Sequence, residues 1–192
     1  MADRKRLGIL ISGRGSNMAA LIDAAAAPDC PWQVVLVASN NPDAAGLARA
    51  AAAGVPTVAF SHKGTAREAF DVRLTQALRA HGAEWVALAG YMRLLSPAFV
   101  ADWAGRLVNI HPSLLPRHKG LDTHARALAA GDREAGASVH HVTELLDDGP
   151  VIAQARVPIL PGDTPETLAA RVLTVENRLY PKALAKAMTD AE

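Results

Sequence analysis

The fold is decided by one stretch near the start of the chain, Leu7-Gly8-Ile9-Leu10-Ile11-Ser12-Gly13-Arg14-Gly15-Ser16-Asn17. The part before Ser12 is apolar at nearly every position, which is typical of a strand that is buried on both faces of a sheet. The glycines permit a sharp turn, and residues 17–26 have the periodicity of a helix. A buried strand that leads through a glycine turn into a helix is the first unit of a parallel sheet covered by helices.

The same alternation continues through the first half of the chain. Further short apolar runs lie at residues 34–38, 57–60, 85–89 and 107–110, and Ala-rich, helix-like segments lie at residues 44–53 and 65–81. Repeated strand–helix–strand units predict an α/β fold with a doubly wound, mostly parallel, Rossmann-like sheet. Its crossovers should be right-handed.

The pattern changes after Pro112. Residues 111–121 are rich in proline, glycine and basic residues and are expected to form an ordered loop. The strand-like segments 138–142 and 151–157 follow it. Too few residues separate these two segments for a crossover helix, so we expect an antiparallel pair in this half of the chain.

A last helix is predicted from Pro165 to Met188. Thr164 has the side chain of an N-cap, and proline is favoured at the first position of a helix. Pro181 lies inside this segment and lacks a backbone N–H, so it is expected to kink or interrupt the helix.

Length and composition limit the classes of protein to consider. A chain of 192 residues suits one domain over residues 1–192. The 20 Lys and Arg nearly balance the 19 Asp and Glu, which argues against a partner that is nucleic acid. The lone cysteine, Cys30, excludes an internal disulfide. Apolar stretches of membrane-span or signal-peptide type are not found, so a cytoplasmic protein is expected, as a monomer or a weak homodimer.

The turn after the first apolar run has the features of a phosphate site. Gly13 and Gly15 let the backbone approach a ligand, and the helix that follows presents free N–H groups and the positive end of its dipole. Ser16 and Asn17 add side-chain donors. The alternative is a plain strand-to-helix turn in which Ser16 or Asn17 is the N-cap. A dinucleotide loop is disfavoured, because Met18 stands where its third glycine would be.

A second polar pair ends the apolar run at residues 107–110. Asn109 and His111 are two residues apart, so both side chains are expected on one face of a strand. Ligands of open α/β sheets bind beyond the carboxyl ends of the strands, and an amide beside an imidazole suits a developing oxyanion. The alternative is that both side chains satisfy backbone groups at the strand end.

Four motifs together resemble one family. They are Gly13-Arg14-Gly15-Ser16-Asn17, Leu88-Ala89-Gly90-Tyr91-Met92-Arg93-Leu94-Leu95-Ser96, Asn109-Ile110-His111-Pro112-Ser113-Leu114-Leu115-Pro116 and Leu146-Asp147-Asp148-Gly149-Pro150. In this order they are similar to the folate-dependent formyltransferases, and among these to the enzymes that act on glycinamide ribonucleotide. The likeness runs from about Leu7 to Pro181.

The resemblance implies a role for residues in each motif. It implies a catalytic trio of Asn109, His111 and Asp147. It implies a ribonucleotide site of Gly15, Ser16, Asn17 and Glu176, and folate contacts from Arg67, Met92, Arg93, Leu94, Leu95 and Asn109. The phosphate-binding half would span about 1–104, and the folate and catalytic half about 105–192. The alternatives are core packing for Met92, Leu94 and Leu95, and solvated helix positions for Arg67 and Glu176.

The implied reaction moves the formyl group of 10-formyltetrahydrofolate to the amine of glycinamide ribonucleotide, in de novo purine (IMP) biosynthesis. Asn109 and protonated His111 would stabilise the oxyanion. Asp147 would favour the protonated imidazole, or hold a water that carries the proton of the amine. Both partners are small molecules, and no metal is expected, because His140 and His141 would leave opposite faces of a strand.

Three alternatives differ in domain content or chemistry. Formyltetrahydrofolate hydrolase would be expected to carry an N-terminal regulatory domain, whereas this chain starts at the first strand. Methionyl-tRNA formyltransferase would be expected to add an RNA-binding domain and a basic balance. A non-catalytic nucleotide-binding module would not need the trio.

One position departs from the family pattern. Many relatives carry His where this chain has Asp122, and an unchanged backbone path would place Asp122 near Asp147, where two carboxylates repel. The alternative is that Asp122 turns outward or pairs with Lys119 or Arg117. Relatives also often continue beyond the end of this chain, and we expect a longer tail to be dispensable because Glu176 is present.

Overall fold

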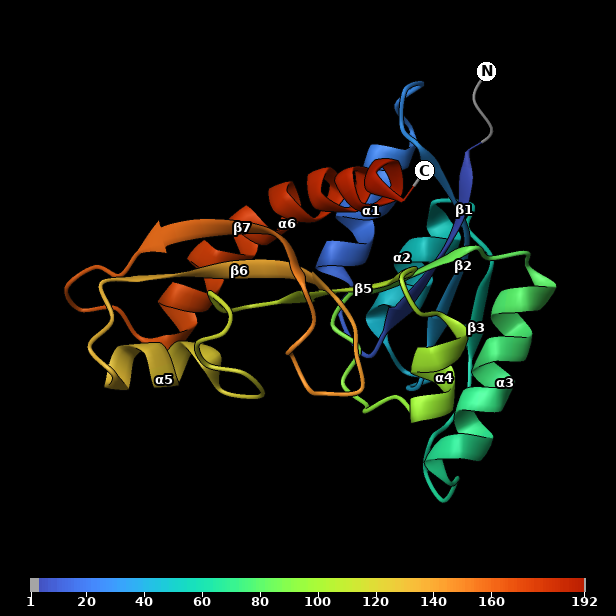
Figure 1. Ribbon diagram of the computed structural model, residues 1–192, viewed down its shortest axis with the longest axis horizontal. Coiled ribbons are helices and arrows are strands. Elements are labelled where there is room, and N and C mark those ends of the chain that lie inside the picture. Colours follow the sequence, from blue (N-terminus) through green and yellow to red (C-terminus); the bar gives the residue numbers. More distant parts are fainter. Residues whose placement is uncertain (1–3, 192) are drawn as a thin grey trace.

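A seven-stranded sheet with the order β3-β2-β1-β4-β5-β6-β7 runs through the computed structural model, which describes residues 4–191 (Figure 1). The strands are β1 (Lys5–Ile11), β2 (Trp32–Ser39), β3 (Thr57–Ala59), β4 (Trp85–Leu88), β5 (Leu107–His111), β6 (Glu134–His141) and β7 (Val151–Pro158). Pairing is parallel from β3 to β5 and antiparallel from β5 to β7. The mostly parallel sheet and the antiparallel pair predicted for the second half are both confirmed.

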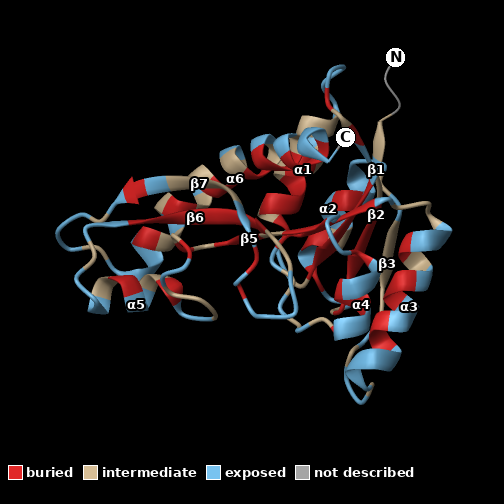
Figure 2. Ribbon diagram, viewed as in Figure 1, coloured by how far each residue is buried: buried red, intermediate tan, exposed pale blue. Residues whose placement is uncertain are grey.

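Helices cover both faces of the sheet. They are α1 (Ser16–Ala25), α2 (Ala45–Ala52), α3 (Arg67–Ala80), α4 (Pro97–Asp102), α5 (Thr123–Ala129) and α6 (Pro165–Asp190). Buried side chains of α1, α2 and α6 share one hydrophobic cluster, and those of α3 and α4 share another. Strand β1 divides its residues between the two, with Ile9 in the first cluster and Leu10 in the second. The apolar runs are therefore strands with a helix layer on each face, and the buried residues fill the middle of the molecule (Figure 2).

Helix α6 starts as predicted and ends two residues beyond Met188, without an interruption at Pro181. Thr164 accepts a hydrogen bond from the N–H of Thr167, and Thr167 returns one to the N–H of Thr164, which makes a capping box. The helix then continues through Pro181, so of the two effects expected of this proline, a kink or an interruption, the interruption is wrong. Side chains on both sides of Pro181 are buried against the sheet, Tyr180 and Leu184 among them, and this packing outweighs one missing backbone hydrogen bond.

The start of α1 differs from the alternative in which Ser16 or Asn17 is the N-cap. Gly15 is the N-cap, in the left-handed region at φ 72°, and no side chain caps the helix, so neither Ser16 nor Asn17 has that role. A Cβ at position 15 would come within 3.1 Å of the Cα of Gly46, so the turn packs tightly against the start of α2. The glycine thus serves both the backbone conformation and the close approach of the two helices.

The strand order reverses between β1 and β4. In open α/β sheets a crevice forms at such a point, beyond the carboxyl ends of the strands. The glycine loop follows β1 there, and residues 89–96 follow β4 and lead into α4. The loop of residues 112–122 leaves the neighbouring strand β5 on the same side. The topology therefore gathers the first three motifs at the carboxyl ends of the parallel strands. The fourth motif follows β6, which is antiparallel to β5, and its Asp147 reaches His111 through the conformation of the loop.

Candidate active site

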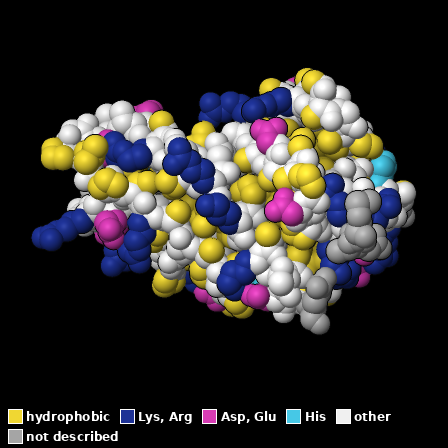
Figure 3. All heavy atoms as spheres, turned by 90° about the horizontal axis from the view of Figure 1, so that it is seen from above, with side chains coloured by type: hydrophobic (Ala, Val, Ile, Leu, Met, Phe, Trp, Pro, Cys, Tyr) yellow, Lys and Arg dark blue, Asp and Glu magenta, His cyan; other side chains and the backbone are white. Residues whose placement is uncertain are grey.

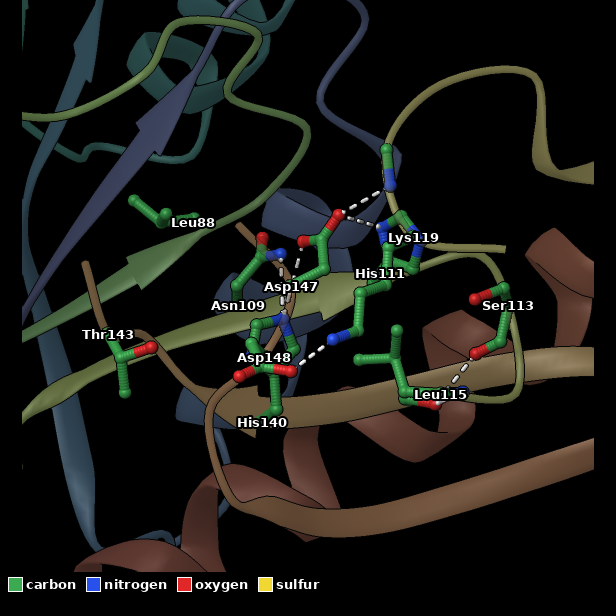
Figure 4. A network of polar contacts seen from close by, with 12 residues as sticks. Leu88, Asn109, His111, Ser113, Leu115, Lys119, His140, Thr143, Asp147 and Asp148 are labelled. Carbon is green, nitrogen blue, oxygen red and sulfur yellow. Dashed lines mark hydrogen bonds and ion pairs between the residues drawn. The ribbon is translucent and has the colours of Figure 1, made fainter. Parts of the chain in front are cut away.

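The catalytic trio expected from the sequence comes together beside β5. Asn109 and His111 lie at the end of that strand, and the antiparallel pairing of β5 with β6 sets Asn109 opposite His140. Asp147 comes from the loop between β6 and β7 and has a positive φ of 49°. Its carboxylate points at the imidazoles of His111 and His140 (Figure 4).

Both ring nitrogens of His111 face groups that accept hydrogen bonds. Nδ1 lies 3.3 Å from Oδ2 of Asp147, and Nε2 lies 3.0 Å from the carbonyl oxygen of His118. An ionised carboxylate and a backbone carbonyl have no proton to give, so the ring satisfies both only when each nitrogen carries a hydrogen. The surroundings of His111 thus select the imidazolium, with the charge of Asp147 beside it.

His140 is a neutral ring with a fixed tautomer. Its Nδ1 lies 2.9 Å from the carbonyl oxygen of His141, which accepts the ring N–H, and burial is the main factor that lowers the pKa of His140. Nε2 then has a free lone pair and accepts from Nδ2 of Asn109 at 3.2 Å. The 3.7 Å approach of Nε2 to Asp147 is therefore not an ion pair. His140 instead fixes which end of the Asn109 amide carries the donors.

The carboxylate of Asp147 is held from the loop that follows β5. The N–H of Gly120 donates to Oδ2 of Asp147 at 2.9 Å. The neighbouring residues of both loops, Lys119 and Asp148, form an ion pair at the surface (Figure 4). Two loops far apart in sequence are thus joined above the imidazole of His111.

The residues expected to bind the ribonucleotide also meet. Asn17, near the start of α1, donates through Nδ2 to Oε2 of Glu176 on α6 at 2.6 Å. Burial raises the pKa of Glu176, and the hydrogen bond from Asn17 opposes that rise in part. Ser16 is half-buried beside them. The first N–H groups of α1 have no partner within the helix, which leaves donors for an anion at this point.

The expected folate contacts lie on a separate surface. Met92 and Leu94 are 67% and 59% exposed, so the core-packing alternative does not hold for them, whereas Leu95 packs against the core. Arg93 is structural: its guanidinium donates to the carbonyls of His62 and Thr65 and stacks on Phe70 at 4.8 Å, and Arg67 begins α3 in an exposed pair with Glu68. Within residues 4–191, no hydrogen bond or ion pair joins these five residues to the trio.

Ser12 connects the glycine loop with the loop of Met92. Its hydroxyl accepts from the N–H of Met92 at 2.7 Å and donates to Oδ1 of the buried Asn40 at 2.6 Å. The end of β1 therefore braces both the expected phosphate loop and the expected folate loop.

Asp122 does not join the carboxylate of Asp147. It is exposed at the N-cap of α5, and no hydrogen bond or ion pair within residues 4–191 connects the two acids. Lys119 pairs with Asp148 and Arg117 with Asp132, so neither cation serves Asp122. Asp122 therefore turns outward to solvent, which was the alternative to a position near Asp147.

Sequence reasoning missed three contributors to the site. His140, the N–H of Gly120 and the carbonyl of His118 reach the trio through strand register and loop conformation. The sequence analysis treats His140 only as a possible metal ligand. A prediction that β6 pairs with β5 in antiparallel fashion would have placed His140 opposite Asn109.

Groups of three or more His, Cys, Asp or Glu able to hold a metal ion are absent from residues 4–191. Over the same residues, helices long and apolar enough to cross a membrane are absent too. On the face shown in Figure 3, basic side chains are interspersed with acidic and apolar ones.

Comparisons with known proteins agree with the geometry. The family model described as formyl transferase matches residues 5–184. The chain is 50% identical over 174 residues to phosphoribosylglycinamide formyltransferase of Escherichia coli, covering 90% of this chain and 82% of that protein. A crystal structure of phosphoribosylglycinamide formyltransferase from Brucella melitensis has a TM-score of 0.91 and 54% identity, with 96% of this chain and 95% of that one covered.

Longer proteins contain a similar region. The chain is 51% identical over 185 residues to the trifunctional purine biosynthetic protein adenosine-3 of Drosophila pseudoobscura pseudoobscura, and it spans 14% of the length of that protein.

Proposed function

The chain belongs to the formyl transferase family, and from this premise we propose that it transfers the formyl group of 10-formyltetrahydrofolate to the amine of glycinamide ribonucleotide. The products are the N-formyl ribonucleotide and tetrahydrofolate, in de novo purine (IMP) biosynthesis. One observation carries the proposal. The buried imidazole of His111 and the buried carboxylate of Asp147 lie beside the oriented, half-buried amide of Asn109 at the carboxyl end of β5, in a chain that is 50% identical to a phosphoribosylglycinamide formyltransferase.

The ribonucleotide binds at the start of α1. Its phosphate takes the free N–H groups after Gly15 and the hydroxyl of Ser16, where the helix dipole favours an anion. Glu176 accepts from a ribose hydroxyl or from the amide N–H of the substrate, and Asn17 holds its carboxylate in place at 2.6 Å. The residues of this site come from α1 and α6, which pack side by side (Figure 1).

The folate occupies the crevice beside the loop of Met92. Exposed apolar side chains at 92 and 94 offer a surface for the flat ring system, and Arg67 at the start of α3 offers a cation for a carboxylate of the glutamate tail. Arg93 belongs to this folate-binding loop. It fixes the shape of the loop through the carbonyls of His62 and Thr65.

Formyl transfer begins when the neutral amine attacks the formyl carbon. A bond forms between the amine nitrogen and that carbon, and the former carbonyl oxygen becomes an oxyanion. Nδ2 of Asn109 and the imidazolium of His111 donate to this oxygen, and each such donor typically contributes ~3 kcal/mol of transition-state stabilisation. Collapse of the intermediate breaks the bond between the carbon and the folate nitrogen.

One proton must move from the attacking amine to the departing folate nitrogen. Asp147 accepts the N–H of Gly120 and faces His111, so its remaining lone pairs can hold a water between the two nitrogens. The water accepts a proton from the amine and gives one to the folate, so the enzyme ends in its starting state. All the steps use side chains of this chain, one water and the two small substrates.

The test is a steady-state assay of the purified chain with both substrates. Tetrahydrofolate release that requires glycinamide ribonucleotide, and that a chelator leaves unchanged, is the expected result. Release without the ribonucleotide would identify a hydrolase. The absence of release with both substrates, while the ribonucleotide still binds, would identify a non-catalytic binding module. Either outcome would overturn the proposed function.

A further inference from the structure

The carbonyl that faces His111 belongs to a residue with an unusual backbone. His118 lies in the loop between β5 and α5 and has φ 52°. A residue with a Cβ pays about 1 kcal/mol or more in this left-handed region, so the conformation persists only where neighbouring contacts hold it. It directs the carbonyl oxygen to within 3.0 Å of Nε2 of His111.

The side chain of His118 supplies such a contact. Its Nε2 lies 2.7 Å from Oδ2 of Asp132, and both side chains are 16% exposed. Asp132 follows α5 and precedes β6, and its N–H donates to the carbonyl of Ala127. The pair therefore ties the loop to the rigid junction of a helix and a strand. On the other side, Ser113 donates to the carbonyl of Arg117 at 2.7 Å.

We propose that His118 and Asp132 are positioning residues for His111. Their pair holds the His118 carbonyl against Nε2, and this carbonyl keeps a proton on that nitrogen. Nδ1 is engaged by Asp147, so Nε2 is the nitrogen that donates to the oxyanion. A charged oxygen is a stronger acceptor than a backbone carbonyl, so the oxyanion takes the N–H over from His118 as the reaction proceeds.

Without this carbonyl the ring has a second acceptable state. A neutral imidazole with its hydrogen on Nδ1 still satisfies Asp147 and leaves a bare lone pair on Nε2. That lone pair would repel an oxyanion. The role of the pair is therefore to exclude the unreactive tautomer. The inference rests on the proposed function, because it assigns His111 to the oxyanion.

Other titratable groups also face His111. Asp147 comes from the loop after β6, His140 from β6 and His124 from α5. Burial is the main factor that lowers the pKa of His140 and of His124, and the charge of His111 lowers both further. Both rings are therefore neutral near pH 7. Measurements at that pH are not affected by a change in the charge of His124 or His140.

The first test separates backbone conformation from the side-chain anchor. His118→Gly keeps the left-handed conformation at no steric cost but removes the bond to Asp132, and Asp132→Ala removes it from the other end. Each variant should lose about tenfold in kcat, since a hydrogen bond to a charged group is lost, with both KM values within about twofold. The double variant should lose no more than either single one.

Two further variants serve as rescue and control. Asp132→Asn keeps a carbonyl oxygen for the N–H of His118 and should restore kcat to within about twofold of the parent. Arg79→Ala breaks an exposed ion pair with Asp102 at 3.1 Å, away from the trio, and should leave kcat unchanged. Additive losses, or a rise in KM with kcat unchanged, would overturn the proposal.

The second test needs no substrate. Nitrogen-15 NMR of the free protein should show a slowly exchanging Nε2–H signal of His111, assigned by its loss in His111→Asn. The signal should persist in Asp132→Asn and broaden or vanish in His118→Gly and Asp132→Ala. An unchanged signal in His118→Gly would overturn the proposal. Absence of formyl transfer by the parent would overturn the proposed function alone, because the NMR comparison still decides whether the pair holds the proton.

Discussion

Proton positions decide what each residue of the trio can do. His140 is neutral and accepts from Asn109, so the second N–H of that amide is free for a ligand. His111 faces two acceptors, one at each ring nitrogen. An amide donor and an imidazole donor therefore lie two residues apart at the end of β5, as expected for a site that stabilises an oxyanion.

Removing these donors should show that they serve one oxygen. Asn109→Ala and His111→Ala should each lower kcat by ~100-fold, as expected for loss of one oxyanion donor. The fold-loss in kcat of the double variant should be smaller than the product of the two single losses, because one donor stabilises the intermediate less when the other is absent. Circular dichroism should show an intact fold. Near-parental turnover in either variant would remove that residue from the mechanism.

Glu176 is a residue where binding and stability conflict. Burial raises its pKa, and the hydrogen bond from Asn17 only partly opposes this. A raised pKa means that the folded state binds a proton more tightly than the unfolded state, so this residue costs stability increasingly as pH rises above 4.5, the value of a free Glu. A carboxylate kept there despite its cost is consistent with a ligand-binding role.

Glu176→Gln should therefore stabilise the free protein and weaken substrate binding. We expect the free energy of unfolding near pH 7 to rise by about 1 kcal/mol, because the amide pays less to be buried. The gain should shrink as the pH approaches 4.5. The KM of the ribonucleotide should rise by about tenfold or more. The same change at the exposed Glu144 is the control for urea unfolding, and a destabilised Glu176→Gln would contradict the argument.

At the scale of elements, the sequence predicts those strands and helices whose positions follow from the burial of apolar residues. The parallel strands are predicted to within about two residues, because helices cover both faces of the sheet and most strand residues are therefore apolar. Strand β6 begins at Glu134, earlier than expected, since Glu134–Ala137 has little β-propensity and is held by pairing with β7. Helices α4 and α5 have 6 and 7 residues, too few to show a helical period.

The long helix α6 tests the balance between local propensity and packing. Pro181 gives no N–H to the carbonyl of Asn177, four residues before it, and proline inside a helix costs ~3 kcal/mol. The ring also stiffens the unfolded chain, which returns up to about 1 kcal/mol. The helix forms nevertheless, because Leu168, Val172 and Tyr180 are fully buried.

Pro181→Ala should therefore raise the free energy of unfolding by about 1–2 kcal/mol. Lys182→Ala, at the exposed neighbouring position, should change it by less than about 0.5 kcal/mol. Denaturant unfolding of the two variants and the parent provides the measurement. A lower midpoint for Pro181→Ala would show that the ring packs in a way that no residue with a free N–H replaces.

At the scale of the whole molecule, the site is a product of topology. The motifs around Asn109 and Asp147 predict the trio from sequence, because specific residue types are needed there. The partners that orient the trio are His140, Gly120 and His118, which contribute through register or a backbone atom. A backbone N–H or carbonyl exists at almost every position, so sequence reasoning had no means to single these out.

The same topology buries histidines around the site, and this sets how the molecule responds to acid. Burial is the main factor that lowers the pKa of His124, His140 and His141 below 6.5. The unfolded chain then binds more protons than the folded one at pH below about 6.5, so folding stability falls as the pH decreases through that range. Glu176 acts with the opposite sign, because its pKa is raised above 4.5.

Between pH 4.5 and pH 6.5, the stability that the three histidines lose should exceed the stability that Glu176 regains. We expect the melting temperature to fall as the pH is lowered from about 7 to about 5, before most carboxylates titrate. In His140→Asn the fall should be smaller, because the most deeply buried of the three rings no longer has to take up a proton. In Glu176→Gln the fall should be steeper, because the opposing group has been removed. Melting curves of the three proteins across this range decide the matter: parallel pH profiles would show that the buried site is not what makes the molecule sensitive to acid.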